Sequence, residues 1–79
     1  MNYFYVEINF DKENSTKTFN GKIEAGEIFD MFLFNCINIY GKVTISPAFF
    51  QVQKFNFWFN NEKDFKKITE WIKKYGEVL

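Results

Sequence analysis

Two stretches near the start of the chain alternate between apolar and polar side chains, which is the pattern of half-buried strands. Residues 3–10 place their even-numbered apolar side chains on one side, and residues 16–25 repeat the alternation with Gly21 on the apolar side. A glycine at such a position marks either a bulge or close packing. Because residues 11–15 between them are polar and rich in turn formers, we predict a hairpin with a loop of about five residues.

Residues 26–36 carry apolar side chains at helical spacing, and two carboxylates, Glu27 and Asp30, lie where the first turn would be. Carboxylates at that end suit the helix dipole, so we predict a helix. Its apolar stripe would consist of Ile28, Phe29, Phe32, Leu33 and Cys36. Met31 and Phe34 lie off this stripe, so either the helix is buried widely or the segment is not helical.

A clearer helical stripe runs through residues 62–75. Its apolar side chains are Phe65, Ile68, Trp71, Ile72 and Tyr75. Asn60 or Asn61 can cap its start, because an asparagine side chain accepts hydrogen bonds from the free backbone amides of a first turn. Gly76 is a natural end for this helix.

Two further strands are predicted over residues 37–46 and 49–60. The first alternates again and ends before Pro47, which cannot donate to a sheet ladder. The second has the sequence FFQVQKFNFWFN, with six aromatic residues in twelve positions, a density that favours a strand. Phe57 and Trp58 would point to opposite sides of it. A strand that is apolar on both sides should be central or should offer one side to a partner.

These elements follow one another as strand, strand, helix, strand, strand, helix (ββαββα). We therefore predict a single domain over residues 1–79 of the α+β class. A four-stranded, mostly antiparallel sheet would carry both helices on one face, as a two-layer sandwich. The opposite face would then expose the rings of Tyr3, Tyr5, Tyr40 and Trp58.

The residue types argue against catalysis. The chain has no histidine for acid–base work, and its single cysteine, Cys36, lies in an apolar stripe without an imidazole to activate it. The four glycines are scattered singly, without the spacing of a phosphate-binding loop. We expect no enzymatic activity, no metal site and no cofactor.

The pattern at the N-terminus does not resemble a signal peptide, because it lacks an early positive charge and a small-residue cleavage site. The longest apolar run, residues 31–34, is far too short to cross a bilayer. These features predict a cytoplasmic protein without a membrane association.

The formal net charge is zero, but the charges are unevenly spread. Residues 1–40 hold three Lys and six Asp or Glu, a net charge of −3, and residues 41–79 hold seven Lys and four Asp or Glu, a net charge of +3. Arginine, which reads phosphate and guanine bidentately, is absent. This balance disfavours a dedicated nucleic-acid binder, and the acidic first half could present a negative edge to a basic partner.

Aromatic residues are in excess of what a small core needs. The chain holds twelve Phe, four Tyr and two Trp, and a domain this short buries only about 60% of its unfolded surface. Tyr and Trp are favoured anchors at protein interfaces. We therefore predict a non-catalytic protein-binding module whose partner-binding residues are Tyr3, Tyr5, Glu7, Tyr40 and Trp58.

Composition also suggests a source and a kind of partner. Phe, Ile, Asn, Lys and Tyr are abundant and have A/T-rich codons, which indicates a low-GC bacterium or a phage or mobile element living in one. A small binding protein from such a source fits an inhibitor of a host defence system, as anti-CRISPR proteins are, that covers a surface of a nucleic-acid-binding host effector. Two alternatives stay open: a single-stranded RNA or nucleic-acid module that stacks bases on the aromatic sheet face, and a structural subunit of a homo-oligomer such as a homodimer.

Overall fold

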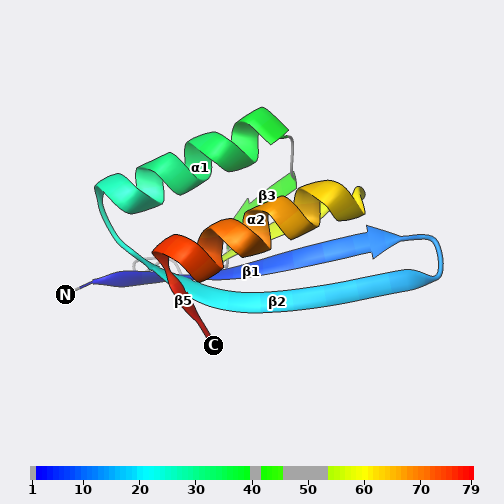
Figure 1. Cartoon of the computed structure of the whole chain (residues 1–79), viewed down its shortest axis with the longest axis horizontal. Coiled ribbons are helices and arrows are strands. Elements are labelled where there is room, and N and C mark those ends of the chain that lie inside the picture. The colour runs from blue at the N-terminus through cyan, green and yellow to red at the C-terminus, as the bar shows by residue number, and fades with distance from the viewer. Residues whose placement is uncertain (1, 40–41, 46–53) are drawn as a thin grey trace.

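The structure, a computed structural model, describes residues 2–39, 42–45 and 54–79. It has two helices packed against one sheet (Figure 1). In chain order the elements are β1 (Tyr3–Lys12), β2 (Ser15–Glu24), α1 (Glu27–Ile39), β3 (Lys42–Ile45), β4 (Lys54–Phe59), α2 (Glu62–Tyr75) and β5 (Glu77–Val78). Among the described residues, no helix has the length and apolar character needed to span a membrane.

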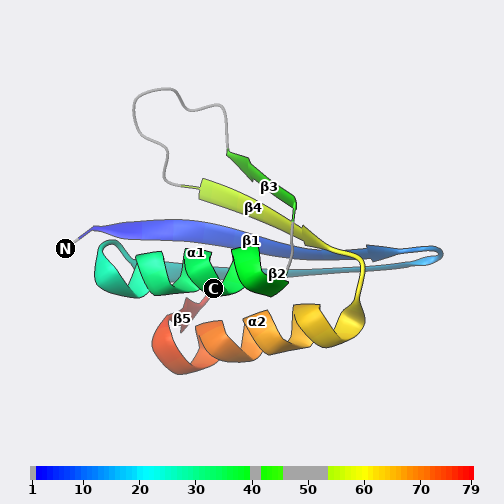
Figure 2. The ribbon, with the colours of Figure 1, turned by 90° about the horizontal axis from the view of Figure 1, so that it is seen from above.

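The sheet has the strand order β3-β4-β1-β2-β5. β1 pairs with β4 in parallel, and the other three pairings are antiparallel. Figures 1 and 2 show α1 and α2 on the same face of this sheet. The predicted two-layer α+β fold with a mostly antiparallel sheet is therefore confirmed. It differs from the prediction in its parallel central pair and in a fifth strand of two residues, β5.

The parallel pair is explained by the length of chain between its two strands. β2, α1 and β3 separate β1 from β4, which leaves room for the crossover that parallel strands require. As a result β1, the first strand of the chain, becomes the centre of the sheet. Both halves of the chain are joined along it, with β2 on one side and β4 on the other.

The turn between β1 and β2 is tighter than predicted. The two strands stay paired up to Lys12 opposite Ser15, so the turn consists of Glu13 and Asn14. Asn14 has a φ of 64°, a left-handed conformation that asparagine adopts more readily than most residues. The prediction of a five-residue loop is wrong because polar side chains do not prevent the backbone of residues 11, 12 and 15 from pairing.

α1 confirms the helix predicted over residues 26–36 and extends it to Ile39. The side chains that it buries are Phe29, Phe32 and Cys36. The strand predicted from residue 37 is wrong over residues 37–39, because these form the last turn of α1. Ile37 lies four residues after Leu33 and Ile39 lies three residues after Cys36, so the two isoleucines fit the end of the helical stripe as well as they fit an alternating strand.

β3 confirms the later part of the strand predicted over residues 37–46, and β4 confirms the second half of the strand predicted over residues 49–60. Residues 40, 41, 46 and 49–53 of those predictions lie outside the described residues. Within β4 the alternation is as predicted, because Phe57 is buried and Trp58 is exposed.

One hydrophobic core fills the space between the sheet and the helices. The Phe32 ring of α1 meets Phe57 of β4 edge-on, with centroids 5.1 Å apart, and Phe29 packs on Phe55 at 5.0 Å. Edge-on and tilted ring pairs of this kind add to the stabilisation that burial provides. The buried members of the core are Val6, Ile8, Ile23, Phe29, Phe32, Cys36, Phe57, Phe59, Ile68 and Ile72.

α2 begins and ends at residues that the sequence singled out. The side-chain oxygen of Asn61 accepts hydrogen bonds from the backbone amides of Lys63 at 2.8 Å and Asp64 at 3.4 Å. Asn61 is therefore the cap, and not Asn60. Gly76 ends the helix and donates its backbone amide to the Ile72 carbonyl oxygen at 2.8 Å.

Candidate binding face

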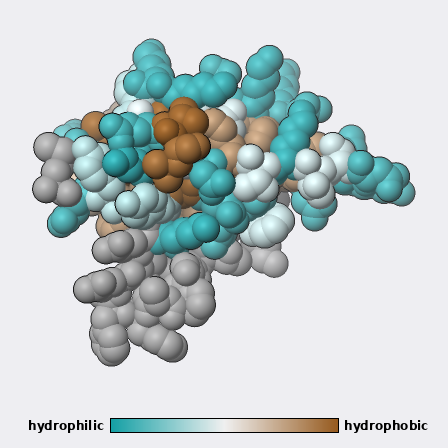
Figure 3. Space-filling model, turned by 90° about the horizontal axis from the view of Figure 1, so that it is seen from below, coloured by the Kyte–Doolittle hydropathy of each residue, from teal (hydrophilic) through white to brown (hydrophobic). Residues whose placement is uncertain are grey.

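The face of the sheet opposite the helices is built from alternate residues of three neighbouring strands. They are Tyr3, Tyr5, Glu7 and Asn9 of β1, Lys54, Asn56 and Trp58 of β4, and Thr18, Asn20 and Lys22 of β2. This surface is termed the open face, because no described helix lies over it (Figure 1). Figure 3, seen from below, shows a mostly hydrophilic surface with an apolar patch near β5, where Val78 and Leu79 are exposed.

Two aromatic side chains of the open face, Tyr5 and Trp58, each remain 41% exposed although they lie on the central strands. In the parallel ladder Tyr5 lies opposite Lys54, and Trp58 lies opposite Asn9. The two rings are therefore four residues apart along the strands, which is about 13 Å at the usual rise of a strand. They form two separate anchor points.

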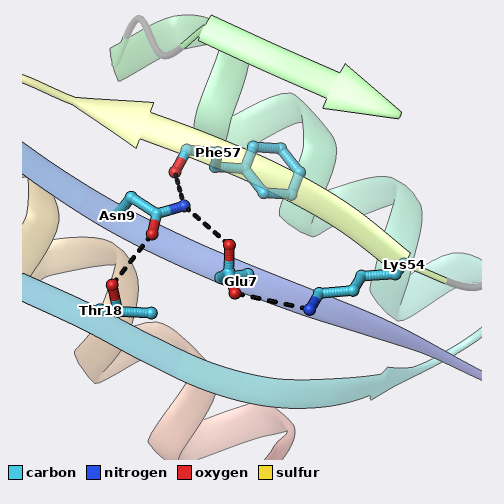
Figure 4. Close-up of polar contacts among 5 residues, drawn as sticks. All are labelled: Glu7, Asn9, Thr18, Lys54 and Phe57. Carbon is cyan, nitrogen blue, oxygen red and sulfur yellow. Dashed lines mark hydrogen bonds and ion pairs between the residues drawn. The ribbon is translucent and has the colours of Figure 1, made fainter. Parts of the chain in front are cut away.

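A polar network joins Glu7, Asn9, Thr18 and Lys54 on the open face (Figure 4). Asn9 lies opposite Trp58 in the ladder, and Lys54 lies opposite Tyr5. The amide nitrogen of Asn9 donates to the Phe57 carbonyl oxygen at 3.3 Å and to the Glu7 carboxylate at 3.4 Å. Its oxygen accepts a hydrogen bond from the Thr18 hydroxyl at 3.1 Å. The Lys54 ammonium lies 3.4 Å from the other carboxylate oxygen of Glu7. These contacts connect β2, β1 and β4 across the open face.

The network fixes a negative charge near the centre of the open face. Asn9 is only 5% exposed, and a buried amide loses free energy unless its hydrogen bonds are made. Its orientation is therefore set by its three partners, and it holds one oxygen of Glu7. The Glu7 side chain is still 26% exposed, and a partly exposed ion pair with Lys54 contributes less than about 1 kcal/mol. The carboxylate thus remains accessible to a donor group of another molecule.

Tyr3 lies on the open face in a half-buried position beside β2. The Lys22 ammonium lies 4.7 Å from the centre of the Tyr3 ring and 3.0 Å from the Glu77 carboxylate of β5. The hydrogen bond and the charge of Glu77 raise the pKa of Lys22. Lys22 therefore keeps its charge over the ring at neutral pH, a favourable cation–π geometry.

The structure places on the open face four of the five residues predicted to bind a partner, namely Tyr3, Tyr5, Glu7 and Trp58. Tyr40 lies outside the described residues. Sequence reasoning missed Asn9, Thr18 and Lys54. The alternation of β1 places Asn9 on the polar side, but its burial depends on β4 lying beside it in parallel, which no local pattern indicated.

Cys36 and the acidic side chains offer little chemistry in this arrangement. Burial raises the pKa of the Cys36 thiol to about 12, so the reactive thiolate is scarce at neutral pH. Among the described residues, no group of three or more Cys, Asp or Glu side chains is placed to hold a metal ion.

The chain matches no protein-family model, and no curated protein or solved structure shows a significant similarity to it.

Proposed function

We propose that this chain is a non-catalytic protein-binding module that covers a partner surface with its open face. The observation that supports this best is the exposure of Tyr5 and Trp58, 41% each, around the fixed Glu7 carboxylate. Rigid aromatic anchors beside an oriented polar group are typical of interface hot spots. Neither ring is needed by the core, which lies on the other face of the sheet.

The chemistry of the open face restricts the partner. A fitting surface would present a cation or another hydrogen-bond donor to Glu7 and apolar groups to the two rings. Lys54 on one side of Glu7 disfavours a cation approaching from that direction. Recognition would therefore depend on shape and on one well-placed donor more than on net charge.

Single-stranded nucleic acid fits the open face less well. Base stacking uses aromatic rings at successive positions together with cations that follow the phosphates, whereas Glu7 places a carboxylate between Tyr5 and Trp58. The lysine-rich helix α2 lies on the other face of the sheet (Figures 1 and 2). A strand bound to the open face could not reach its exposed lysines, which are Lys63, Lys66, Lys67, Lys73 and Lys74.

We further propose that the partner belongs to a host defence system and that the protein acts in the cytoplasm as a phage or mobile-element inhibitor, in the manner of anti-CRISPR proteins. The support for this is the small size and the composition of the chain, and no feature of the fold adds to it. A homo-oligomer that pairs its open faces is the second candidate, because self-association would cover the same rings. Light scattering separates the two, since a foreign partner requires no self-association.

Affinity purification from a low-GC bacterial lysate, with and without nuclease, tests the proposed function. We expect a protein that stays bound after nuclease treatment, and a loss of about tenfold or more in binding for Tyr5→Ala or Trp58→Ala. The double variant Lys66→Glu with Lys73→Glu is the control and should bind like the wild type. Loss of the partner on nuclease treatment would support the nucleic-acid alternative. Loss of binding in the lysine variant would place the interface on α2 and not on the open face. Unchanged binding by Trp58→Ala would contradict a role for the open face.

A further inference from the structure

α1 carries an apolar surface that neither the core nor the open face uses. Met31 is 53% exposed and Phe34 is 66% exposed. They are three residues apart in the helix, so their side chains are neighbours on its outer surface. The fold does not need them, because the same helix fills the core from its other side with Phe29, Phe32 and Cys36.

Two carboxylates extend this apolar pair into one stripe. Glu27 lies four residues before Met31, and Asp30 lies four residues before Phe34, so all four side chains share one side of the helix. Glu27 and Asp30 are exposed, and the ion pairs formed within the described part of the chain involve neither of them. α1 itself contains no basic residue. These four residues are termed the α1 stripe.

Asn35, the residue after Phe34, does not cover the α1 stripe. Asn35 donates its amide to the Met31 carbonyl oxygen at 2.9 Å, so it folds back onto the backbone of its own helix. The stripe therefore presents an exposed phenyl ring and an exposed thioether beside two carboxylates that form no ion pair within the described part of the chain. Methionine and phenylalanine at such a surface adapt to apolar side chains of a partner.

We infer that the α1 stripe is a second docking surface and that its occupant is a basic amphipathic segment of another protein. Apolar side chains of that segment would pack on Phe34 and Met31, and its Lys or Arg side chains would pair with Glu27 and Asp30. Charge complementarity selects this occupant, because an acidic segment would be repelled by the same carboxylates. An amphipathic helix laid along another helix or groove is a common mode of peptide recognition.

The α1 stripe and the open face lie on opposite sides of the sheet (Figures 1 and 2). Occupation of one surface therefore leaves the other free. The stripe is small compared with the roughly 800 Å² that each partner contributes to a standard interface, so binding there should be weak and transient unless the open face is engaged by the same partner. In that case the two sites would reinforce each other through their linkage.

An NMR titration of the full chain, labelled with ¹⁵N, tests this inference with defined peptides as probes. The first probe is a helical peptide of leucine and lysine, and the matched control has glutamate at every lysine position. We expect the amide signals of residues 27–34 to shift with the lysine peptide and not with the glutamate peptide. Phe34→Ser and Asp30→Lys should each weaken binding about fivefold or more, whereas Leu79→Ser, a change at a similarly exposed apolar residue (63% exposed), should have no effect.

Three results would overturn the inference. They are equal binding of the two peptides, signal shifts that lie on α2 or the open face instead of α1, and unchanged affinity of Phe34→Ser. Self-association of the wild type that Phe34→Ser abolishes, measured by sedimentation velocity, would replace the foreign segment with a second copy of the chain. Should Phe34→Ser fail to fold, Asp30→Lys carries the same test. Trp58→Ala must leave peptide binding unchanged, so this inference and the proposed function fail separately.

Discussion

Gly21 shows, at the scale of a single residue, how closely α2 and β5 approach β2. A Cβ atom built at this position would lie 2.7 Å from Cγ2 of Ile72 and 3.0 Å from the carbonyl oxygen of Glu77. The pairing of β1 with β2 continues through Gly21, opposite Val6, without interruption. Of the two roles that the sequence allowed, a bulge and close packing, the structure therefore shows close packing.

We expect Gly21→Ala to lower the free energy of unfolding by about 1–3 kcal/mol, because the added methyl group must displace α2 or β5. Urea denaturation followed by circular dichroism measures this change. Asn20→Ala, at the exposed neighbouring position, is the control and should stay within about 0.5 kcal/mol of the wild type. Equal stability of Gly21→Ala and the wild type would show that α2 can move away from β2 at no cost.

The buried Cys36 thiol should make the free energy of unfolding depend on pH in the alkaline range. Burial raises the pKa of its thiol to about 12, whereas an unfolded cysteine ionises near pH 8.5. Above that pH the unfolded state loses this proton and the folded state retains it, so the free energy of unfolding should fall as pH rises from about 9 towards 12. Chemical denaturation at a series of pH values should show a weaker decline for Cys36→Ala, because tyrosine and lysine ionisation remains in both proteins. Identical slopes would mean that Cys36 is accessible to water in the folded state.

At the scale of one element, α2 depends on an N-terminal cap, for which the sequence offered two candidates, Asn60 and Asn61. We expect Asn61→Ala to destabilise the protein by about 1 kcal/mol, since the backbone amides of Lys63 and Asp64 lose their acceptor. Asn60→Ala is the matched control and should be close to neutral, because Asn60 is exposed and makes no contact with those amides. Thermal unfolding of both variants gives the comparison, and the reverse order of stabilities would assign the cap to Asn60.

Elements with a long, regular pattern were predictable from the sequence, and elements defined by backbone contacts were not. The alternation of β1 and the stripe of α2 indicate their buried sides directly, although Tyr75 at the end of the α2 stripe is 47% exposed. The tight turn at Asn14 and the strand β5 arise from backbone pairing, which the pattern of apolar and polar side chains does not indicate. The last turn of α1 was missed because residues 37–39 fit both periods.

Only one property of the candidate site was predictable from the sequence, namely the side of its own strand on which each residue lies. Period two places Tyr5, Glu7 and Trp58 on one side of their strands, and the structure brings these strands together as neighbours. The order of the strands was not contained in any local pattern. For that reason the sequence did not reveal that Asn9 would become buried beside β4 and would orient Glu7.

At the scale of the whole molecule, the two faces of the sheet have separate roles. The helices cover one face and bury the aliphatic and phenylalanine side chains of β1 and β4. On the other face, polar side chains and exposed rings alternate with them along the same strands. Consecutive residues of one strand therefore belong to different parts of the molecule, one to its stability and the next to its surface.

Phe57→Ala and Trp58→Ala, one position apart in β4, test this separation. Phe57 is 0% exposed and meets the Phe32 ring at 5.1 Å, so its truncation should cost about 3–5 kcal/mol. That is most of the stability a domain of this size has, about 5 kcal/mol, and the variant should lose its cooperative unfolding transition. Trp58→Ala removes a larger but 41% exposed ring, and we expect a cost below about 1 kcal/mol.

Residue size alone would predict the reverse order for these two variants, so the comparison reports on burial. Circular dichroism during heating measures the unfolding transition in each variant. In Trp58→Ala the only remaining tryptophan is Trp71, whose ring packs on that of Phe32 with centroids 5.6 Å apart. Its fluorescence therefore reports on the core of this variant. If Trp58→Ala unfolds as Phe57→Ala does, its ring is part of what holds the sheet together. The open face would then lose one of its two aromatic anchors, and the proposed function would lose the separation between stability and binding on which it rests.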